Sequence, residues 1–599
     1  MLTSRLVPRA ARVPPPALRS SRTLTSRAPR PQARAVSHPY AQRRQQHFVR
    51  SVAAVITLWA AASAWQWYSP GGGIARDVHA EEPERDAVEL EFEAPRRQAT
   101  SRDDHRNIIS SQHLQVVTSW EKPGVYAWGS NAGKTVAPDS DEKYIKTPRR
   151  IRWFDGKLLR DVKLDRDFGA AIDDKGDLLQ WGAAFSQDVS EPTATLTGHN
   201  LTSLAISRDR ILALNASGTV FSIPVSRAEQ QDGPKPSASA SWLPFWGAAS
   251  NDVSYRLRTP QTLSWTEKVT DISSGLEHAL LLTSAGRVFS LASGTQDYPT
   301  KGQLGIPGLT WKTRPPGPFD MPHEITTLKG FRIGKIATGD YHSLVCDTAG
   351  RVFSFGDNTN GQLGFSYDPE APFVDAPSLL PTQKLFAGTQ GKVTNVFAGG
   401  NTSFLTTEYT KPGTKLATAD TWSFGFGLTG QLGIGRWVHA QTDPFKIPAL
   451  SGLFEWDEAK NTTIPIRLDS ISVGASHAAA ILDNVASVAV SGPSRRLTEN
   501  DTNWGRDIVF WGNNEFYQLG TGKRSNMATP TYIQPLDQAA ELQRAASVAA
   551  PTAPQPGRDK DMHRFQITPR SSLHLAGKKV DVEQKVVCGR ACTAVYSAV

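Results

Sequence analysis

Cysteine is scarce in this chain, because its 599 residues include only Cys346, Cys588 and Cys592. Three thiols exclude a scaffold held by many disulfides and a metal domain built on cysteine ligands. The Gly-x-Ser-x-Gly sequence found around the nucleophile of many hydrolases is also absent. With 48 glycines and 40 prolines, the composition favours many turns over long helices.

Acidic residues are missing from the start of the chain, and the first one is Asp77. Residues 1–50 contain eleven arginines and no lysine, among many Ser, Ala and Pro residues. This composition is typical of a mitochondrial presequence, with a disordered basic tail as the alternative. Residues 51–599 carry 55 basic and 57 acidic side chains, so the net charge of +9 does not describe the folded part. That near neutrality weakens a nucleic-acid-binding interpretation.

Charged residues are also absent from Ser51–Tyr68. As a helix this segment is about 27 Å long, enough to span the hydrocarbon core of a bilayer. Arginines precede it and mainly acidic residues follow it, which predicts the N-terminus in the matrix and the body in the intermembrane space. The matrix is the alternative location for the body, and a secretory signal peptide is a competing interpretation. We therefore expect a presequence (1–50), a transmembrane helix in the inner membrane (51–68) and an acidic, polar linker (69–119).

Two short sequence elements recur seven times each in residues 120–599. The first is a strand that ends in an aromatic or apolar residue, often before Gly, as in VYAWG at 125–129. The second is a strand, a loop and another strand, as in IATGDYHSLVC at 336–346. A third element, GQLG, occurs at 302–305, 361–364 and 430–433, and as YQLG at 517–520. A repeat of about 50 residues built from short strands predicts a β-propeller.

The two ends of the repeat array complement each other. The array begins with a first element that has no preceding partner and ends with a second element that has no following one. Because unpaired strand edges seek a partner, we expect residues 125–128 to pair with residues 593–597 and close the ring.

The combined pattern of -WG-x-N-x-x-GQLG-, -V-x-x-G-x-x-H-S- and -x-G-x-V- resembles the regulator of chromosome condensation family. The resemblance covers about residues 120–599 and is strongest in 270–365 and 420–520. It implies an all-β fold, a seven-bladed β-propeller, with insertions at 224–260 and 534–581; the second is expected to be flexible. With its presequence and membrane segment, the chain is similar to fungal mitochondrial members associated with assembly of ubiquinol–cytochrome c reductase (respiratory complex III).

The resemblance assigns structural roles to residues that recur in the repeats. They are Trp128, Gly129, Trp181, Gly182, Gly275, His278, Gly302, Gly305, Gly339, His342, Gly361, Gly364, Gly430, Gly433, Gly474, His477, Trp511, Gly512, Gly520 and Gly589. The three histidines occupy one slot in different repeats, so we expect hydrogen-bonding or packing roles and no shared metal site. We expect no catalytic residue and no cofactor. Trp242, Phe245 and Trp246 in the first insertion either dock on a membrane or partner protein or fill a local core.

The closed array of loops, the absence of a convergent catalytic set and the membrane segment favour a non-enzymatic, membrane-anchored scaffold. The resemblance implies that this scaffold assists assembly of respiratory complex III. Its expected partners are subunits or assembly factors of that complex, with no small-molecule substrate. A guanine nucleotide exchange factor for a mitochondrial GTPase and a mitoribosome biogenesis factor are the alternatives.

Overall fold

The computed structural model describes residues 112–599, apart from residues 114, 236–252, 387, 411–412, 414–415, 458–460, 489–501, 537–540, 542–562 and 576–577. The predicted presequence, the predicted transmembrane helix and most of the linker lie outside the described residues, as do Trp242, Phe245 and Trp246. Within the described part, no helix is both long and apolar enough to cross a membrane.

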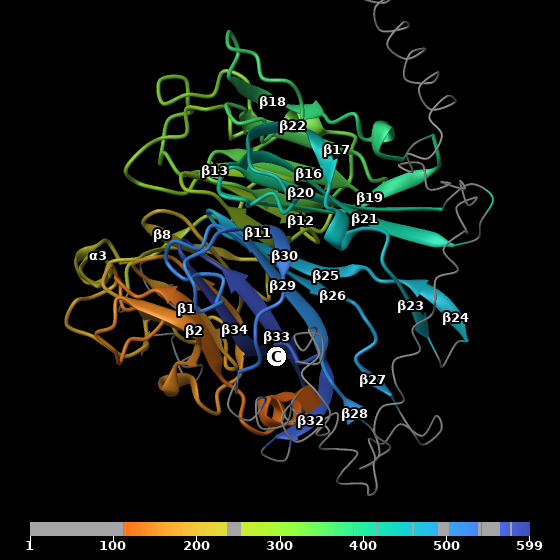
Figure 1. Cartoon of the computed structure of the whole chain (residues 1–599). Coiled ribbons are helices and arrows are strands. Elements are labelled where there is room, and N and C mark those ends of the chain that lie inside the picture. The colour runs from red at the N-terminus through yellow and green to blue at the C-terminus, as the bar shows by residue number, and fades with distance from the viewer. Residues whose placement is uncertain are drawn as a thin grey trace, which may run out of the picture. The chain divides into compact units, whose positions relative to one another are not determined.

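The described residues form an all-β propeller, and Figure 1 shows the strands of its sheets. The inner strands of the sheets surround a central cavity. Four sheets have four antiparallel strands each. The strands of the first two are β7 (Leu201–Ile206), β8 (Arg210–Asn215), β9 (Val220–Pro224) and β10 (Arg256–Leu257), then β11 (Val269–Ser274), β12 (His278–Thr283), β13 (Val288–Ala292) and β14 (His323–Glu324). The strands of the other two are β15 (Ile333–Thr338), β16 (His342–Asp347), β17 (Val352–Asp357) and β18 (Phe373–Leu379), then β19 (Gly391–Gly399), β20 (Thr402–Thr410), β21 (Ala417–Gly427) and β22 (Val438–Lys446).

A fifth sheet has the same four-strand order and one added strand. It consists of β25 (Leu468–Val473), β26 (His477–Leu482), β29 (Arg506–Gly512) and β30 (Met527–Thr531), with β31 (Gln566–Ile567) paired to β29. Smaller elements lie in the segments that connect these strands. They are the hairpins β23 (Phe454–Asp457) with β24 (Thr462–Pro465) and β27 (Ser487–Val488) with β28 (Thr502–Asn503), the helix α3 (Arg227–Asp232), and the 3₁₀ turns η1 (Arg152–Phe154), η2 (Thr326–Leu328), η3 (Thr382–Phe386) and η4 (Pro448–Leu450).

The remaining strands belong to one sheet of nine strands. They are β1 (Val125–Ser130), β2 (Tyr144–Arg150), β3 (Leu159–Leu164), β4 (Gly169–Asp173), β5 (Leu178–Trp181), β6 (Thr193–Ala194), β32 (Ser571–Leu575), β33 (Lys578–Cys588) and β34 (Cys592–Ala598). Leu159 and Ala598 form a parallel pair that joins β3 to β34, and the Val599 amide donates to the Leu159 carbonyl at 3.0 Å. The prediction of seven separate blades is therefore wrong, because the structure has five blades and this fused sheet.

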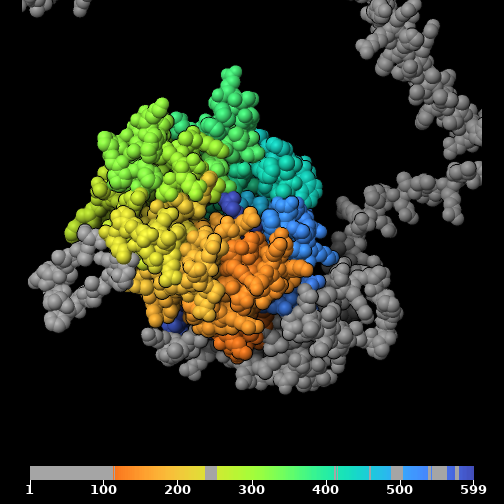
Figure 2. Space-filling view, turned by 90° about the vertical axis from the view of Figure 1, so that its left-hand side faces the viewer, coloured from red at the N-terminus to blue at the C-terminus, as the bar shows by residue number. Residues whose placement is uncertain are grey.

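The predicted pairing of the two ends of the array is confirmed. Strand β1 lies antiparallel to β34, with Val125 opposite Tyr596 and Trp128 opposite Thr593. In Figure 2, blue residues from the C-terminal part of the array lie beside orange residues from its N-terminal part. The start and the end of the array thus share one sheet and complete its hydrogen bonding.

The hydrophobic cores lie between neighbouring sheets, because each sheet buries both of its faces. Strands β12, β16, β26 and β34 are buried along their whole length. Between the sheets of β7–β10 and β11–β14, Leu212 and Leu214 pack with Leu281 and Phe289. A continuous apolar run without alternation is expected for a strand covered on both faces.

Glycines close the hairpins that join the second element of one repeat to the first element of the next. Gly176, Gly218, Gly286 and Gly350 have φ values between 82° and 91°. The Gly176 amide donates to the Asp173 carbonyl at 3.1 Å, and the other three turns contain the same bond. A side chain in this left-handed conformation is unfavourable, which explains glycine at these positions.

The structure describes only the two ends of the first predicted insertion, but it describes two strands within the second. In the first, α3 and β10 flank residues 236–252, which lie outside the described residues. In the second, the expectation of a flexible segment over 534–581 needs correction, because β31 and β32 lie within it. Strand β31 is held by β29, and β32 is held by β33. The end of the linker also contacts this region, since Gln115 Nε2 donates to the Gln566 carbonyl at 2.5 Å.

Candidate functional site

A cavity of about 480 Å³ lies at the centre of the propeller. Its lining comes from strands β3, β7, β11, β15, β19, β25 and β33 and from the loops that follow them. Backbone hydrogen bonds join neighbouring loops, from Leu276 N to Asp340 O at 3.2 Å and from Asp340 N to Gly400 O at 2.7 Å. The main chain around this end of the cavity is therefore fixed by contacts between sheets.

The predicted glycines of the second element lie at these contacts. A Cβ atom on Gly275 would lie 2.2 Å from the Gly339 carbonyl oxygen, and one on Gly589 would lie 2.1 Å from the Leu164 carbonyl oxygen. Likewise, a Cβ atom on Gly339 would lie 2.6 Å from the Gly400 carbonyl oxygen, and one on Gly474 would lie 2.4 Å from the Gly589 carbonyl oxygen. Any side chain at these positions would push neighbouring loops apart.

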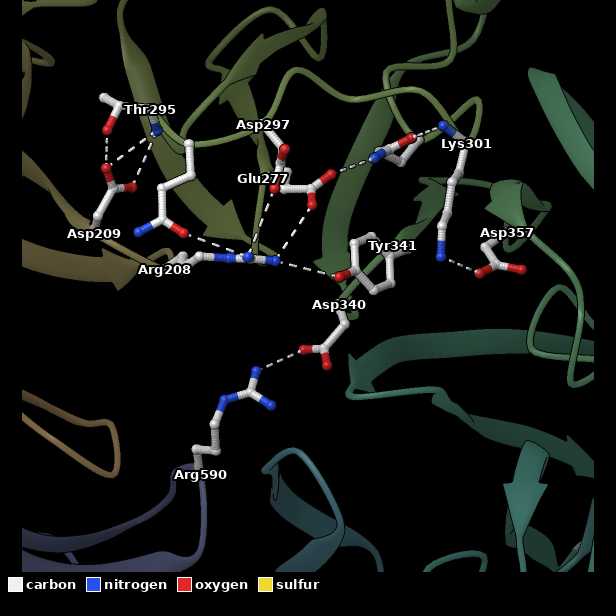
Figure 3. A network of polar contacts seen from close by, with 12 residues as sticks. Arg208, Asp209, Glu277, Thr295, Asp297, Lys301, Asp340, Tyr341, Asp357 and Arg590 are labelled. Carbon is white, nitrogen blue, oxygen red and sulfur yellow. Dashed lines mark hydrogen bonds and ion pairs between the residues drawn. The ribbon is translucent and has the colours of Figure 1, made fainter. Parts of the chain in front are cut away.

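Charged side chains cluster at the same end of the cavity (Figure 3). We call this set the mouth network, and it consists of Asp165, Arg208, Glu277, Lys301, Asp340, Asp357 and Arg590. Arg590, in the β33–β34 loop, extends toward the β15–β16 loop, where its Nη2 lies 3.1 Å from Asp340 Oδ1. Its Nε lies 3.9 Å from Asp165 Oδ2. Burial raises the pKa of Asp165, and the charge of Arg590 opposes this shift.

The second part of the mouth network is centred on Arg208. Its Nη2 lies 3.4 Å from both Glu277 Oε1 and the Tyr341 hydroxyl, and its Nη1 lies 3.6 Å from Asp297. Burial raises the pKa of Glu277, and Arg208 counteracts that shift. Lys301 lies 3.8 Å from the centre of the Tyr341 ring and 3.1 Å from Asp357 Oδ2. Loops from several sheets thus present fixed charges of both signs at one end of the cavity, an arrangement suited to selective protein contacts.

The three predicted histidines lie in separate seams between consecutive repeats. His278, His342 and His477 are buried, and their Nε2 atoms lie 2.8, 2.8 and 2.7 Å from the hydroxyls of Ser343, Ser403 and Thr593. Those hydroxyls donate to the carbonyls of Gln303, Gln362 and Gln518. Burial lowers the pKa of the histidines to about 3, 4 and 3. Each neutral ring therefore links one repeat to the next.

The predicted tryptophans and the GQLG glycines form the same kind of link. Trp128 Nε1 donates to the Gln518 carbonyl at 2.8 Å, and Trp511 Nε1 donates to the Gln431 carbonyl at 2.8 Å. Trp181 Nε1 donates to the Thr135 carbonyl at 2.9 Å. The final glycines of the GQLG elements lie against the aromatic rings of the following repeat. They are Gly305 against Phe355, Gly364 against Phe424, Gly433 against Trp511 and Gly520 against Trp128.

The remaining predicted glycines lie where main chain approaches closely. A Cβ atom on Gly302, Gly361 or Gly430 would approach a backbone atom of Val374, Thr442 or Met527 within 2.8 Å. Gly129, Gly182 and Gly512 have φ values of 115°, 100° and 110° and face the backbone of Ala591, Asp167 and His477. Their role in the structure is close packing of the repeats.

Across the described residues, no three His, Cys, Asp or Glu side chains are placed to hold a metal ion. Cys588 and Cys592 are buried free thiols, and burial raises the pKa of Cys588 to about 12. A thiol with such a pKa is a poor nucleophile at neutral pH.

The mouth network was not among the residues predicted from the sequence. Three of its members lie between the glycine and the histidine position of the second element, namely Glu277 in SGLEH (274–278), Asp340 in TGDYH (338–342) and Arg590 in CGRAC (588–592). Aligning the repeats and asking where charge occurs in the two positions after that glycine's slot and before the histidine would have identified Glu277, Asp340 and Arg590.

Comparison with known proteins gives local and extended matches. Models of the regulator of chromosome condensation (RCC1) repeat match residues 335–362 and 349–406. Protein FMP25, mitochondrial, from Saccharomyces cerevisiae is 29% identical over 431 residues, which cover 68% of this chain and 64% of the yeast protein. This chain therefore spans less than two thirds of that relative. RCC1 domain-containing protein RUG3, mitochondrial, from Arabidopsis thaliana is 23% identical over 59% of this chain and 71% of its own.

The crystal structure of human WBSCR16 aligns with a TM-score of 0.49 and 18% identity, covering 80% of this chain and 99% of that chain.

Proposed function

Because the chain belongs to the regulator of chromosome condensation family of repeat proteins, we propose that its propeller is a non-enzymatic platform that binds other proteins. The mouth network carries this proposal. It places positive and negative side chains in fixed positions on loops from several sheets. Such complementary charges determine which partner binds and in which orientation.

We further propose that the platform assists assembly of respiratory complex III at the mitochondrial inner membrane. Two relatives carry the word mitochondrial in their names, and residues 1–50 have the composition of a presequence. The uncharged run at 51–68 supports a membrane anchor. The link to complex III rests on the resemblance to fungal members with that role.

Deleting the gene should lower the amount of mature complex III on native gels, and the wild-type gene should restore it. A variant with Arg590→Glu should restore less than half of the wild-type amount, because it replaces the ion pair with Asp340 by repulsion between two carboxylates. Arg149→Glu is the matched control, since Arg149 has a similarly exposed side chain on the outer strand β2 and does not line the cavity.

Two results would contradict these proposals separately. Normal complex III in the deletion strain would reject the assembly role. Full restoration by Arg590→Glu, at wild-type protein levels, would reject the mouth network as the binding surface.

The side of the membrane can be tested by protease protection. We expect the propeller to be protected in intact mitochondria and degraded once the outer membrane is ruptured, because the arginine-rich end should remain in the matrix. Protection that persists until the inner membrane is dissolved would place the propeller in the matrix instead.

A further inference from the structure

A second pocket lies apart from the central cavity, in the blade formed by β7–β10. Its volume is about 310 Å³, and its polar lining comes from Arg210, Glu229, Asp232, Ser254 and Arg256. Arg210 begins strand β8, Glu229 and Asp232 belong to α3, and Arg256 begins β10. None of these residues lines the central cavity.

Arg210 is buried without a full set of partners. Only 9% of its surface is exposed, and its Nε has no hydrogen-bond partner. Its ion pair with Glu229 has a separation of 3.6 Å, and the Glu229 side chain is 56% exposed. A buried guanidinium is normally paired and fully hydrogen-bonded, because burying a charge is costly. This pocket therefore has unused capacity to bind an anion.

The neighbouring arginines increase that capacity. Arg256 and Arg258 both bind the buried carboxylate of Asp320, at 3.2 and 2.7 Å. One carboxylate thus serves two guanidiniums, and the Arg258 Nε is also without a partner. Burial lowers the pKa of Arg210, and the charge of Arg256 lowers it further, against the opposing effects of Glu229, Asp209 and Asp320. The guanidiniums of Arg210 and Arg256 therefore line the pocket together with the carboxylates of Glu229 and Asp232.

We propose that this pocket binds a phosphate group carried by a small soluble molecule. A phosphate dianion would accept hydrogen bonds from the free Nε of Arg210 and from Arg256, and would displace the long ion pair with Glu229. The pocket is larger than inorganic phosphate alone, which leaves room for an organic group beside Pro224 and Pro234. The carboxylates of Glu229 and Asp232 would repel a phosphate group. Removing the charge of Glu229, which also pairs with Arg210, should therefore raise the affinity for phosphate. Asp209 is already engaged, because it accepts a bond from the Thr295 amide at 3.1 Å.

Isothermal titration calorimetry on the full-length protein tests this proposal, with inorganic phosphate and glycerol 3-phosphate as probes. Both should bind, and Arg210→Gln should weaken binding at least tenfold, because a charge-assisted hydrogen bond is lost. Glu229→Gln should strengthen binding about threefold by removing the competing carboxylate. Its control is Glu142→Gln, which removes the same charge from an exposed site in the loop between β1 and β2. Tighter binding of glycerol 3-phosphate than of inorganic phosphate would support a small, soluble phosphate ester as the ligand.

Arg210→Gln could prevent folding, so Arg256→Gln provides a second test. The Arg256 side chain is 38% exposed, and the matched control Arg149→Gln changes a side chain that is 39% exposed. Arg256→Gln should weaken phosphate binding several-fold, and Arg149→Gln should not change it. The proposal is rejected if the wild-type protein binds neither probe, or if Glu229→Gln and Glu142→Gln have equal effects.

Discussion

A chain that ends at residue 584 should lose the cooperative thermal unfolding of the full-length protein. Removing residues 585–599 takes away β34, which pairs with β1 and β33 on its two sides. Every residue of β34 is buried, including Val595 and Tyr596. Large buried side chains contribute about 2 to 5 kcal/mol each, so the loss should be comparable with the 5 to 15 kcal/mol that typically stabilises a folded domain.

The closing contacts extend beyond this one strand. Thr593 receives the hydrogen bond of His477 and donates to the Gln518 carbonyl, which also accepts from Trp128. Deletion therefore breaks the seam between the first and the last repeat as well as the sheet. Differential scanning calorimetry should show a broad transition, or none, for the shortened chain.

A deletion of similar length elsewhere provides the control. Residues 454–465 include the hairpin β23–β24, whose strands pair only with each other. Replacing them with a short Gly-Ser linker should lower the unfolding temperature by only a few degrees. If the chain ending at residue 584 unfolded as sharply and at the same temperature as the full-length protein, the closure would not contribute to stability.

The repeat pattern predicted this closure because each repeat carries its own strand signals. An apolar strand before Gly, a hairpin glycine and a GQLG turn are local features, and the structure has strands and turns at those positions. The pairing of β1 with β34 followed from counting which elements lacked a partner. Such reasoning needs no knowledge of individual side-chain contacts.

The fusion of β3 with β34 could not be predicted in the same way. It depends on one parallel pair, Leu159 with Ala598, and on the amide of Val599. Strand β31 was missed for a similar reason, because two residues beside a low-complexity segment carry little periodicity. The mouth network was missed because its residues vary in charge from one repeat to the next. Only the folded chain brings Arg590 to Asp340, which lies 250 positions earlier.

Stability should also fall steeply between pH 6.5 and about pH 4, because three histidines are held neutral in the folded protein. Burial lowers the pKa of His278, His342 and His477 to about 3, 4 and 3, whereas an unfolded histidine has a pKa of about 6.5. Below pH 6.5 the unfolded chain therefore binds protons that the folded chain cannot, and the balance shifts toward unfolding. Above pH 6.5 both states are neutral at these sites, so the effect disappears.

The size of this effect follows from the difference in pKa. At pH 4.5 each histidine should cost about 2 to 3 kcal/mol, and the three together on the order of 8 kcal/mol. Asp165 and Asp271, which line the central cavity, act in the opposite direction, because desolvation raises the pKa of their carboxyls and protonation then favours the folded state. The histidines should dominate, since their rings are fully buried and a proton would also disturb the hydrogen bonds to the next repeat.

Urea unfolding at pH 7.5 and at pH 5 measures this dependence directly. His342→Asn should lower stability at pH 7.5, where the bond to Ser403 is lost, but should reduce the further loss between the two pH values by about one third. His439→Gln is the control, because His439 is exposed on β22 and should leave the pH dependence of the parent unchanged. If the parent protein were equally stable at both pH values, His278, His342 and His477 would accept protons in the folded state. The conclusion that neutral histidine rings link the repeats would then be wrong.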